Sequence, residues 1–183
     1  SISEKNFHRN IAIAKGVIVN LLKLLYYLQR KGIALRDMKP ENMFLIGNSE
    51  NPEKYLRNAN EYRIGLIDLE TCVNFEGGKR TAQPLLAGTP EYGTPSHLFE
   101  NEVLESMYPD LNRIMHLQDW YATLGIIFRT IVARPLFEKT AGLFLEIIRI
   151  KHQAMERKIS AEQVFRDTSW IFWTSAVEEF NVN

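Results

Sequence analysis

Cysteine is almost absent from the sequence, and histidine is sparse. The single cysteine, Cys72, can form no internal disulfide and leaves no cysteine framework for zinc. The histidines also lack the spacing of metal ligands. The four of them are His8, His97, His116 and His152. These absences argue against a disulfide-stabilised secreted domain and against a zinc site.

A net charge and long apolar runs are missing as well. The 22 Lys and Arg residues balance the 22 Asp and Glu residues, so no overall positive field attracts nucleic acid. The longest apolar stretches, such as residues 124–128, fall far short of the ~20 residues that cross a bilayer. The first residues do not resemble a signal peptide. We therefore expect no nucleic-acid partner, no membrane association and a cytoplasmic location.

The composition is that of a globular protein. The 183 residues are 45% hydrophobic and 24% charged, and they suffice for one sizeable core. Apolar side chains recur at spacings of three, four and seven, which is the period of an α-helix. This pattern predicts helices at residues 8–31, 97–107, 119–133, 142–157 and 161–180.

Two strand-sized apolar runs interrupt the helices, at residues 43–46 and 63–67. We interpret them as an antiparallel ribbon with a long polar insertion at 47–62, which includes one helical turn near 52–58. Residues 70–96 are rich in Gly and Pro and show no periodicity, which predicts an irregular loop. The predicted fold is therefore mainly α, with a short antiparallel ribbon.

The helix predicted at 119–133 is apolar on nearly every face, which predicts that it is buried, Leu124 included. Asp119 stands at its first position, where an N-cap residue belongs. The aromatic cluster at 170–173 is expected either to fill the core or to form a surface that another segment covers.

Three polar residues follow the first predicted helix in a segment that is not helical, namely Asp37, Lys39 and Asn42. Asp68 ends the second predicted strand. If the two strands pair, Asn42 and Asp68 lie at the same end of the ribbon. Carboxylate and amide oxygens are the ligands that Mg²⁺ prefers. The sequence therefore predicts a magnesium site at that end.

Four motifs follow one another along the chain. They are Arg-Asp-Met-Lys-Pro-Glu-Asn at 36–42, Ile-Asp-Leu-Glu at 67–70, Gly-Thr-Pro-Glu-Tyr-Gly-Thr-Pro at 88–95 and Asp-Trp-Tyr-Ala-Thr-Leu-Gly at 119–125. In this order they resemble the C-terminal lobe (C-lobe) of a eukaryotic-type serine/threonine protein kinase. The resemblance covers residues 10–157. It implies an α+β fold in which a helical bundle carries a short ribbon with the catalytic and metal-binding loops.

The resemblance implies transfer of the γ-phosphoryl group of ATP to a protein substrate, with Mg²⁺ as cofactor. It makes Asp37 the catalytic base and places Lys39 against the transferring phosphoryl group. It implies that Asn42 and Asp68 bind the metal ions, which in turn hold the phosphates of ATP. Thr89 is expected to contact Asp37 and Lys39, which favours a serine or threonine acceptor.

Further roles are implied by the same resemblance. Phe44 is expected to form one wall of the adenine site. Arg36 is expected to pair with a phosphate on the 70–96 loop, and Thr81 is the expected phosphate acceptor. Asp119 is expected to brace the backbone of the catalytic loop, which is a structural role.

Several positions depart from the kinase pattern. Leu35 replaces the histidine before Arg-Asp, and Leu69 with Glu70 replaces Phe-Gly after the metal-binding aspartate. Both leucines are expected to stack in the hydrophobic spine of the lobe. Ser96 replaces a glutamate that forms a buried ion pair in the family.

The sequence has no match to the N-terminal lobe (N-lobe) of a kinase, because it lacks a Gly-x-Gly-x-x-Gly loop and only 36 residues precede Asp37. We expect the N-lobe to come from the same parent chain or from another chain, and the isolated 183 residues to be inactive. The expected C-lobe comprises a long helix at 1–32, the catalytic loop and ribbon at 33–69 with the insertion at 47–62, an activation and substrate-positioning loop at 70–96, and a helical base at 97–183.

Two other functions stay open at this point. The departures at Leu35, Leu69 and Ser96 favour a pseudokinase-like binding or regulatory module. The Ile-Asp-Leu-Glu motif at 67–70 also resembles aminoglycoside and choline kinases, which phosphorylate small molecules. The 88–95 motif argues against that last class, because such a loop positions a protein substrate.

Overall fold

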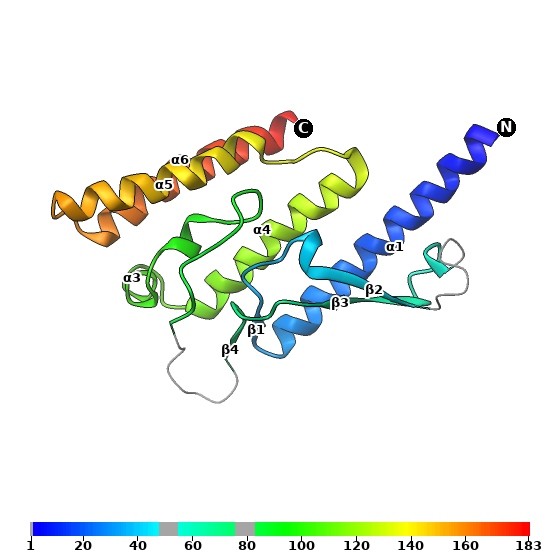
Figure 1. The fold of residues 1–183 in the computed structure, drawn as a ribbon, viewed down its shortest axis with the longest axis horizontal. Helices are drawn as coiled ribbons and strands as arrows, with labels where there is room; N and C mark the ends of the chain where they lie inside the picture. Colours follow the sequence, from blue (N-terminus) through cyan, green and yellow to red (C-terminus); the bar gives the residue numbers. More distant parts are fainter. Residues whose placement is uncertain (1, 48–54, 76–82) are drawn as a thin grey trace.

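The computed structural model describes residues 2–47, 55–75 and 83–183. This part of the chain is mainly α-helical, as the sequence predicts, and it contains two small antiparallel sheets, of which one was predicted (Figure 1). The helices are α1 (Ile2–Arg30), α3 (Asn101–Met107), α4 (Leu111–Val132), α5 (Glu138–Glu156) and α6 (Ala161–Val182), with short 3-10 helices η1 (Pro40–Asn42) and η2 (Pro95–Leu98). The strands are β1 (Ile33–Ala34), β2 (Met43–Gly47), β3 (Tyr62–Leu66) and β4 (Val73–Asn74).

Helix α4 runs through the middle of the molecule, with α1 on one side and the antiparallel pair α5 and α6 on the other (Figure 1). Met115 and Tyr121 of α4 belong to an apolar cluster with α3, α5 and α6, whereas Ala122 and Ile126 belong to a second cluster with α1. One helix therefore links both parts of the core. The segment at 36–42 lies beside α4, and its Met38 belongs to the second cluster.

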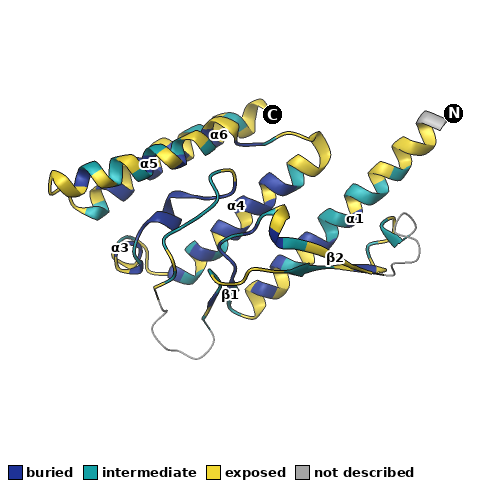
Figure 2. Cartoon of the chain, viewed as in Figure 1, coloured by how far each residue is buried: buried dark blue, intermediate teal, exposed yellow. Residues whose placement is uncertain are grey.

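Helix α1 begins at Ile2, well before the predicted residue 8. Residues 4–8 are exposed and, apart from Phe7, polar, so they carry no apolar stripe that a sequence pattern could detect (Figure 2). The end of the helix is as predicted. Gly32 adopts a φ of 60° and its N–H donates to the Gln29 carbonyl at 3.1 Å, which closes the last turn.

Helix α4 also begins earlier than predicted, at Leu111. Its N-cap is Asp110, whose side chain accepts a hydrogen bond from the Arg113 N–H at 3.0 Å. The prediction that Asp119 caps this helix is wrong, because Asp119 lies inside it. Leu111, Ile114 and Met115 stand at spacings of three and four before Asp119, and the prediction missed this signal.

The prediction that this helix is buried on nearly every face is wrong as well. Leu124 is 41% exposed and Ile131 is 61% exposed, because only two faces of α4 contact the core clusters. The aromatic residues at 170–173 likewise differ in burial. Phe172 is fully buried, whereas Trp170 is 76% exposed, so core filling is correct only for part of the cluster.

Strands β2 and β3 form the predicted antiparallel ribbon. Met43 pairs with Leu66 and Leu45 pairs with Ile64, which directs Met43, Ile64 and Leu66 toward the α1 core cluster. Of the predicted turn at 52–58, residues 55–58 are described, and they form a turn in which the Asn58 N–H donates to the Tyr55 carbonyl at 3.0 Å. A second pairing, of β1 with β4, was not predicted, since two-residue strands carry no periodic signal.

The remaining helices follow the prediction with shifted ends. The predicted helix at 97–107 is split into η2 and α3 by the extended residues Phe99 and Glu100. Helix α5 begins before the predicted residue 142, and α6 begins at the N-cap Ser160, whose side chain accepts from Gln163 N–H. The irregular character expected at 70–96 holds for the described residues there, apart from β4 and the start of η2.

One helical segment, Glu4–Arg30 in α1, is long and apolar enough to cross a membrane by length and composition alone. Core helices of soluble proteins pass the same criterion. In this fold Leu21, Leu25 and Leu28 of the segment are buried against the second core cluster.

Candidate functional site

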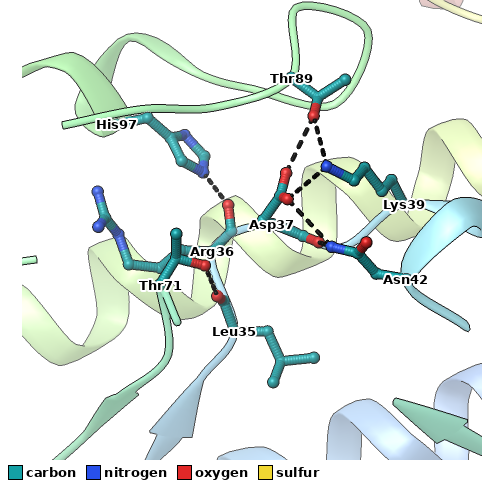
Figure 3. A network of polar contacts seen from close by, with 8 residues as sticks. All are labelled: Leu35, Arg36, Asp37, Lys39, Asn42, Thr71, Thr89 and His97. Carbon is teal, nitrogen blue, oxygen red and sulfur yellow. Dashed lines mark hydrogen bonds and ion pairs between the residues drawn. The ribbon is translucent and has the colours of Figure 1, made fainter. Parts of the chain in front are cut away.

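Four motif residues form one hydrogen-bonded cluster around the carboxylate of Asp37 (Figure 3). Lys39 Nζ lies 2.6 Å from Asp37 Oδ2, and Thr89 Oγ1 donates to Asp37 Oδ1 at 3.0 Å. Lys39 Nζ also lies 3.4 Å from Thr89 Oγ1. Asn42 Nδ2 donates to Asp37 Oδ2 at 3.0 Å and to the Asp37 carbonyl at 3.1 Å. The carboxylate is thus held in one orientation by three neighbours.

The 3-10 turn η1 explains why Lys39 and Asn42 converge. Pro40 occupies its first position, and the Asn42 N–H donates to the Lys39 carbonyl at 3.0 Å, so the chain turns back toward Asp37. The side chain of Asn42 is 7% exposed. Because its nitrogen is bound to Asp37, its amide oxygen points away from that carboxylate (Figure 3).

Asp68 lies at the end of the ribbon that the sequence predicts for it. The Ile67 N–H donates to the Asn42 carbonyl at 3.0 Å, so Asn42 and Asp68 lie at the same end of β2 and β3. Asp68 is exposed and has a φ of 58°. A non-glycine residue in this left-handed region costs roughly 1–3 kcal/mol, and such residues concentrate at functional sites. Arg36, in the other motif, has a φ of 67°.

The chemistry of these donors fits a hard divalent cation. The free amide oxygen of Asn42 and the exposed carboxylate of Asp68 are oxygen ligands, and Mg²⁺ is commonly held by one or two such groups together with water and phosphate. Within residues 2–47, 55–75 and 83–183, no cluster of three or more His, Cys, Asp or Glu side chains is arranged to hold a metal ion. Phosphate oxygens would therefore have to complete the coordination.

Asp119 holds the backbone immediately before Asp37. Its Oδ2 accepts from the Leu35 N–H and its Oδ1 from the Arg36 N–H, each at 2.8 Å. This is the brace that the resemblance implies. Burial raises the pKa of Asp119 to about 7, while the two backbone N–H groups and the charge of Arg36 act in the opposite direction.

The side chain of Arg36 is buried, with 4% exposed. Its Nε donates to Gln118 Oε1 and its Nη1 to the Leu85 carbonyl, both at 3.1 Å. Burial lowers the pKa of Arg36 to about 10, and the charge of Asp119 opposes this effect. The expected pairing of Arg36 with a phosphate stays a prediction, because Thr81 lies outside the described residues.

His97 completes the support of the loop and was missed by the sequence reasoning. Its Nε2 lies 2.7 Å from the Arg36 carbonyl, and its Nδ1 lies 3.0 Å from the Thr94 backbone nitrogen (Figure 3). Since Nδ1 accepts from that N–H, the proton is on Nε2, which donates to Arg36. Burial, followed by the charge of Arg36, lowers the pKa of His97 to about 4. The imidazole is therefore neutral.

Hydrogen bonds of Ser96 and Gln118 connect η2 with α4. Gln118 Nε2 donates to Ser96 Oγ at 2.8 Å, and Ser96 Oγ lies 2.9 Å from Thr94 Oγ1. Ser96, which replaces the glutamate of the kinase pattern, therefore takes part in a chain of hydrogen bonds between uncharged groups. No signal in the sequence pointed to Gln118, because it lies before the predicted start of its helix.

Leu35 and Leu69, the two leucines at which the sequence departs from the kinase pattern, have different environments. Leu35 is 6% exposed and belongs to the core cluster that also contains Leu28 and Met38. Leu69 is 53% exposed in this chain, and the stacking of both leucines in a spine stays a prediction. Leu69 follows the left-handed Asp68, and the turn at that residue directs the chain away from the core.

Phe44 lies flat across the ribbon. It is opposite Gly65 in the register, and a Cβ added to Gly65 would lie 2.4 Å from the tip of the ring. Glycine at this position therefore leaves room for the ring on the outer face of the ribbon. The side chain is 46% exposed and lies on β2, two residues after Asn42 of η1, so it presents an apolar surface.

Neither a model of a known protein family nor a curated protein matches the sequence. The assignment of a function therefore rests on the geometry of the cluster around Asp37 and on the motif order. The motifs lie at residues 36–42, 67–70, 88–95 and 119–125.

Proposed function

We propose that this chain is the C-lobe of a serine/threonine protein kinase, which transfers the γ-phosphoryl group of ATP to a protein hydroxyl when an N-lobe completes the nucleotide site. The observation that carries the proposal is the cluster of Asp37, Lys39, Asn42 and Thr89 around one carboxylate. Phosphoryl transfer needs mainly positioning and charge neutralisation, and this cluster provides groups for both.

Each residue has a task that its position permits. Asp37 accepts the proton of the acceptor hydroxyl, and its hydrogen bonds from Thr89 and Asn42 fix the carboxylate for this role. Lys39 lies beside Asp37 with its side chain 23% exposed, so its ammonium group can contact a phosphoryl oxygen. Asn42 and Asp68 would hold Mg²⁺, which neutralises charge on the phosphates.

The substrate class follows from Thr89. Its hydroxyl bridges Asp37 and Lys39, and it lies in the segment 88–95 that resembles the substrate-positioning loop of protein kinases. A loop that reaches the catalytic aspartate in this way supports a polypeptide acceptor rather than an aminoglycoside or choline.

A pseudokinase-like module is the second candidate. It is favoured by the exposure of Leu69, which leaves the segment after Asp68 without the apolar anchor that the family has there. Among the described residues no side chain forms a hydrogen bond with Asp68, so in that part of the chain its position relative to Asn42 depends on the end of the ribbon.

The deciding experiment uses the polypeptide combined with its N-lobe, and measures Mg-ATP affinity and phosphate transfer to a Ser/Thr peptide library. Asp68→Asn should weaken Mg-ATP binding, because a neutral amide gives up charge opposite the cation. Asp37→Asn should keep the affinity and lower turnover by roughly 10²–10⁴-fold, as for loss of a general base.

Asp167→Asn, on the exposed surface of α6, serves as the matched control and should change neither quantity. Equal loss of nucleotide affinity in the Asp37 and Asp68 variants would contradict the division of roles. No transfer by the unmodified protein, with nucleotide still bound, would favour the pseudokinase. Transfer to kanamycin or choline but not to peptides would favour a small-molecule kinase.

A further inference from the structure

A pocket of about 530 Å³ lies between α1 and the start of β3. Its walls come from residues 20–27 of α1, from Ala59 and Asn60, and from the first residues of β3. Asp68 follows the other end of β3, which runs from Tyr62 to Leu66. No residue of the Asp37 cluster lines the pocket. It is therefore a separate site, at the end of the ribbon opposite to the predicted magnesium ligands.

Two hydrogen bonds hold the walls of this pocket together. The side chain of Asn20 is buried, and its Nδ2 donates to the Ala59 carbonyl at 3.0 Å. Lys23 Nζ donates to Asn60 Oδ1 at 3.4 Å. Both bonds join α1 to the segment that leads into β3, so the pocket is formed without a ligand.

The charge of the lining is positive. Lys23 and Arg63 are exposed and line the pocket, and no aspartate or glutamate does. Neither cation forms an ion pair with a described residue. Glu61 stands nearby in the sequence, but it is outside the lining and accepts from Asn58 Nδ2 at 3.0 Å. Although the whole chain is neutral, this pocket therefore favours an anion.

The elements around the pocket contain almost no negative charge. The only acidic residue of α1 is Glu4, 19 positions before Lys23, which is roughly 28 Å along a helix. Strands β2 and β3 have no acidic residue. Charges at such a distance are largely screened by salt, so Glu4 does not neutralise the pocket.

The rest of the lining is apolar and includes one aromatic ring. Leu24 and Ile64 are partly buried and pack against the second core cluster. Tyr27 lines the same pocket and is 57% exposed, so its ring is accessible to a ligand. Aromatic rings pair favourably in stacked or edge-to-face arrangements. The pocket thus combines two cations with a surface for an aromatic group.

We propose that this pocket binds an aryl phosphate, with the aromatic ring against Tyr27 and the phosphate at Lys23 and Arg63. A phosphate monoester carries a charge of about −1.5 to −2 at pH 7, which matches two cations better than a single carboxylate does. Arginine offers paired N–H donors to phosphate oxygens, and lysine contributes a point charge. The same group occurs in a free aryl phosphate and in phosphotyrosine.

The test uses phenyl phosphate as the probe and follows its binding to the 183-residue chain by ¹H–¹⁵N NMR at pH 7.5. The amide signals of Asn60 and Arg63 should shift. Lys23→Met and Arg63→Met should each weaken binding by roughly 3- to 10-fold, because each removes one charge-assisted contact that water partly screens. Lys23→Arg keeps the charge and should retain binding. Arg57→Met is the matched control, since this exposed cation does not line the pocket.

Three further probes define the ligand. Phenyl sulfate, a monoanion, should bind more weakly than phenyl phosphate, and phenol more weakly still. Raising the salt concentration should weaken binding of both anions. A short peptide with one phosphotyrosine that binds at least tenfold more tightly than phenyl phosphate would assign the site to a protein partner. Equal affinities would assign it to a free aryl phosphate.

Four results would overturn the proposal. They are phenol binding as tightly as phenyl phosphate, undiminished binding by the Lys23→Met/Arg63→Met double variant, an equal loss in Arg57→Met, and loss of binding in Lys39→Met alone. The last result would place the probe at the Asp37 cluster. Because Lys23 and Arg63 are exposed, their variants should keep the melting temperature of the original protein, and thermal unfolding checks this.

Discussion

Acid should selectively weaken the contribution of His97 to stability. The imidazole is 1% exposed and lies between the Thr94 N–H and the Arg36 carbonyl, so it has room for only one proton. A second proton on Nδ1 would oppose the Thr94 N–H in a site that already contains the Arg36 guanidinium. Asp37 is the nearby negative charge that favours protonation, and its effect is smaller than that of burial.

The sign and the size of this change in stability follow from the pKa of His97 in the unfolded chain and in the folded protein. The pKa of His97 is lowered from 6.5 to about 4 in the folded protein. Below pH 6.5 the unfolded chain therefore binds a proton that the folded protein does not, and stability present above pH 6.5 is lost as the pH falls toward 4. Between pH 7 and pH 4.5 this loss amounts to roughly 2 kcal/mol.

The pH dependence of the unmodified protein alone does not isolate this effect. The raised pKa of Asp119, about 7, acts in the opposite direction, because a carboxyl group that is protonated more readily in the folded state gains stability as the pH falls. The difference between the unmodified protein and a His97 variant removes this background. His97→Gln is the suitable variant, since glutamine keeps an N–H donor for the Arg36 carbonyl and does not titrate.

The assay is urea unfolding of both proteins at pH 7 and pH 4.5. The variant should be less stable than the unmodified protein at pH 7, and the difference should shrink by roughly 2 kcal/mol at pH 4.5. His152→Gln, at an exposed position of α5, controls for the loss of any histidine. An unchanged difference between the two pH values would refute the reasoning that His97 is neutral because it is buried.

Three further predictions concern stability. Asp119→Asn should destabilise by roughly 1–3 kcal/mol in urea unfolding, because one amide oxygen cannot accept both backbone N–H bonds; an unaffected midpoint would show that the brace is dispensable. Phe172→Ala should cost about 3–5 kcal/mol, and Leu124→Ala less than about 1.5 kcal/mol, because only the first is fully buried; equal losses in thermal unfolding would contradict this burial. Gly65→Ala should lower the melting temperature, because the new methyl group meets the Phe44 ring, and the loss should disappear in a Phe44→Ala background.

Much of the architecture was contained in the order of apolar and polar residues. The helices and the β2–β3 ribbon have periodic patterns long enough to detect, and the ribbon's register placed Asn42 and Asp68 at one end as predicted. The errors are at the helix ends. The prediction put the start of α4 at Asp119, and it missed the cap at Asp110 and the apolar residues Leu111, Ile114 and Met115, which already stand at helical spacing.

The local composition of the 36–42 segment indicated which side chains could do chemistry, since Asp37, Lys39 and Asn42 lie within six positions of one another. Their convergence with Thr89 depends on the tertiary structure, because the 88–95 segment reaches Asp37 only when its loop packs against α4. The same holds for the support by His97. Its spacing from Arg36, 61 positions, carries no periodic signal, and only the packed core lowers its pKa by removing it from water.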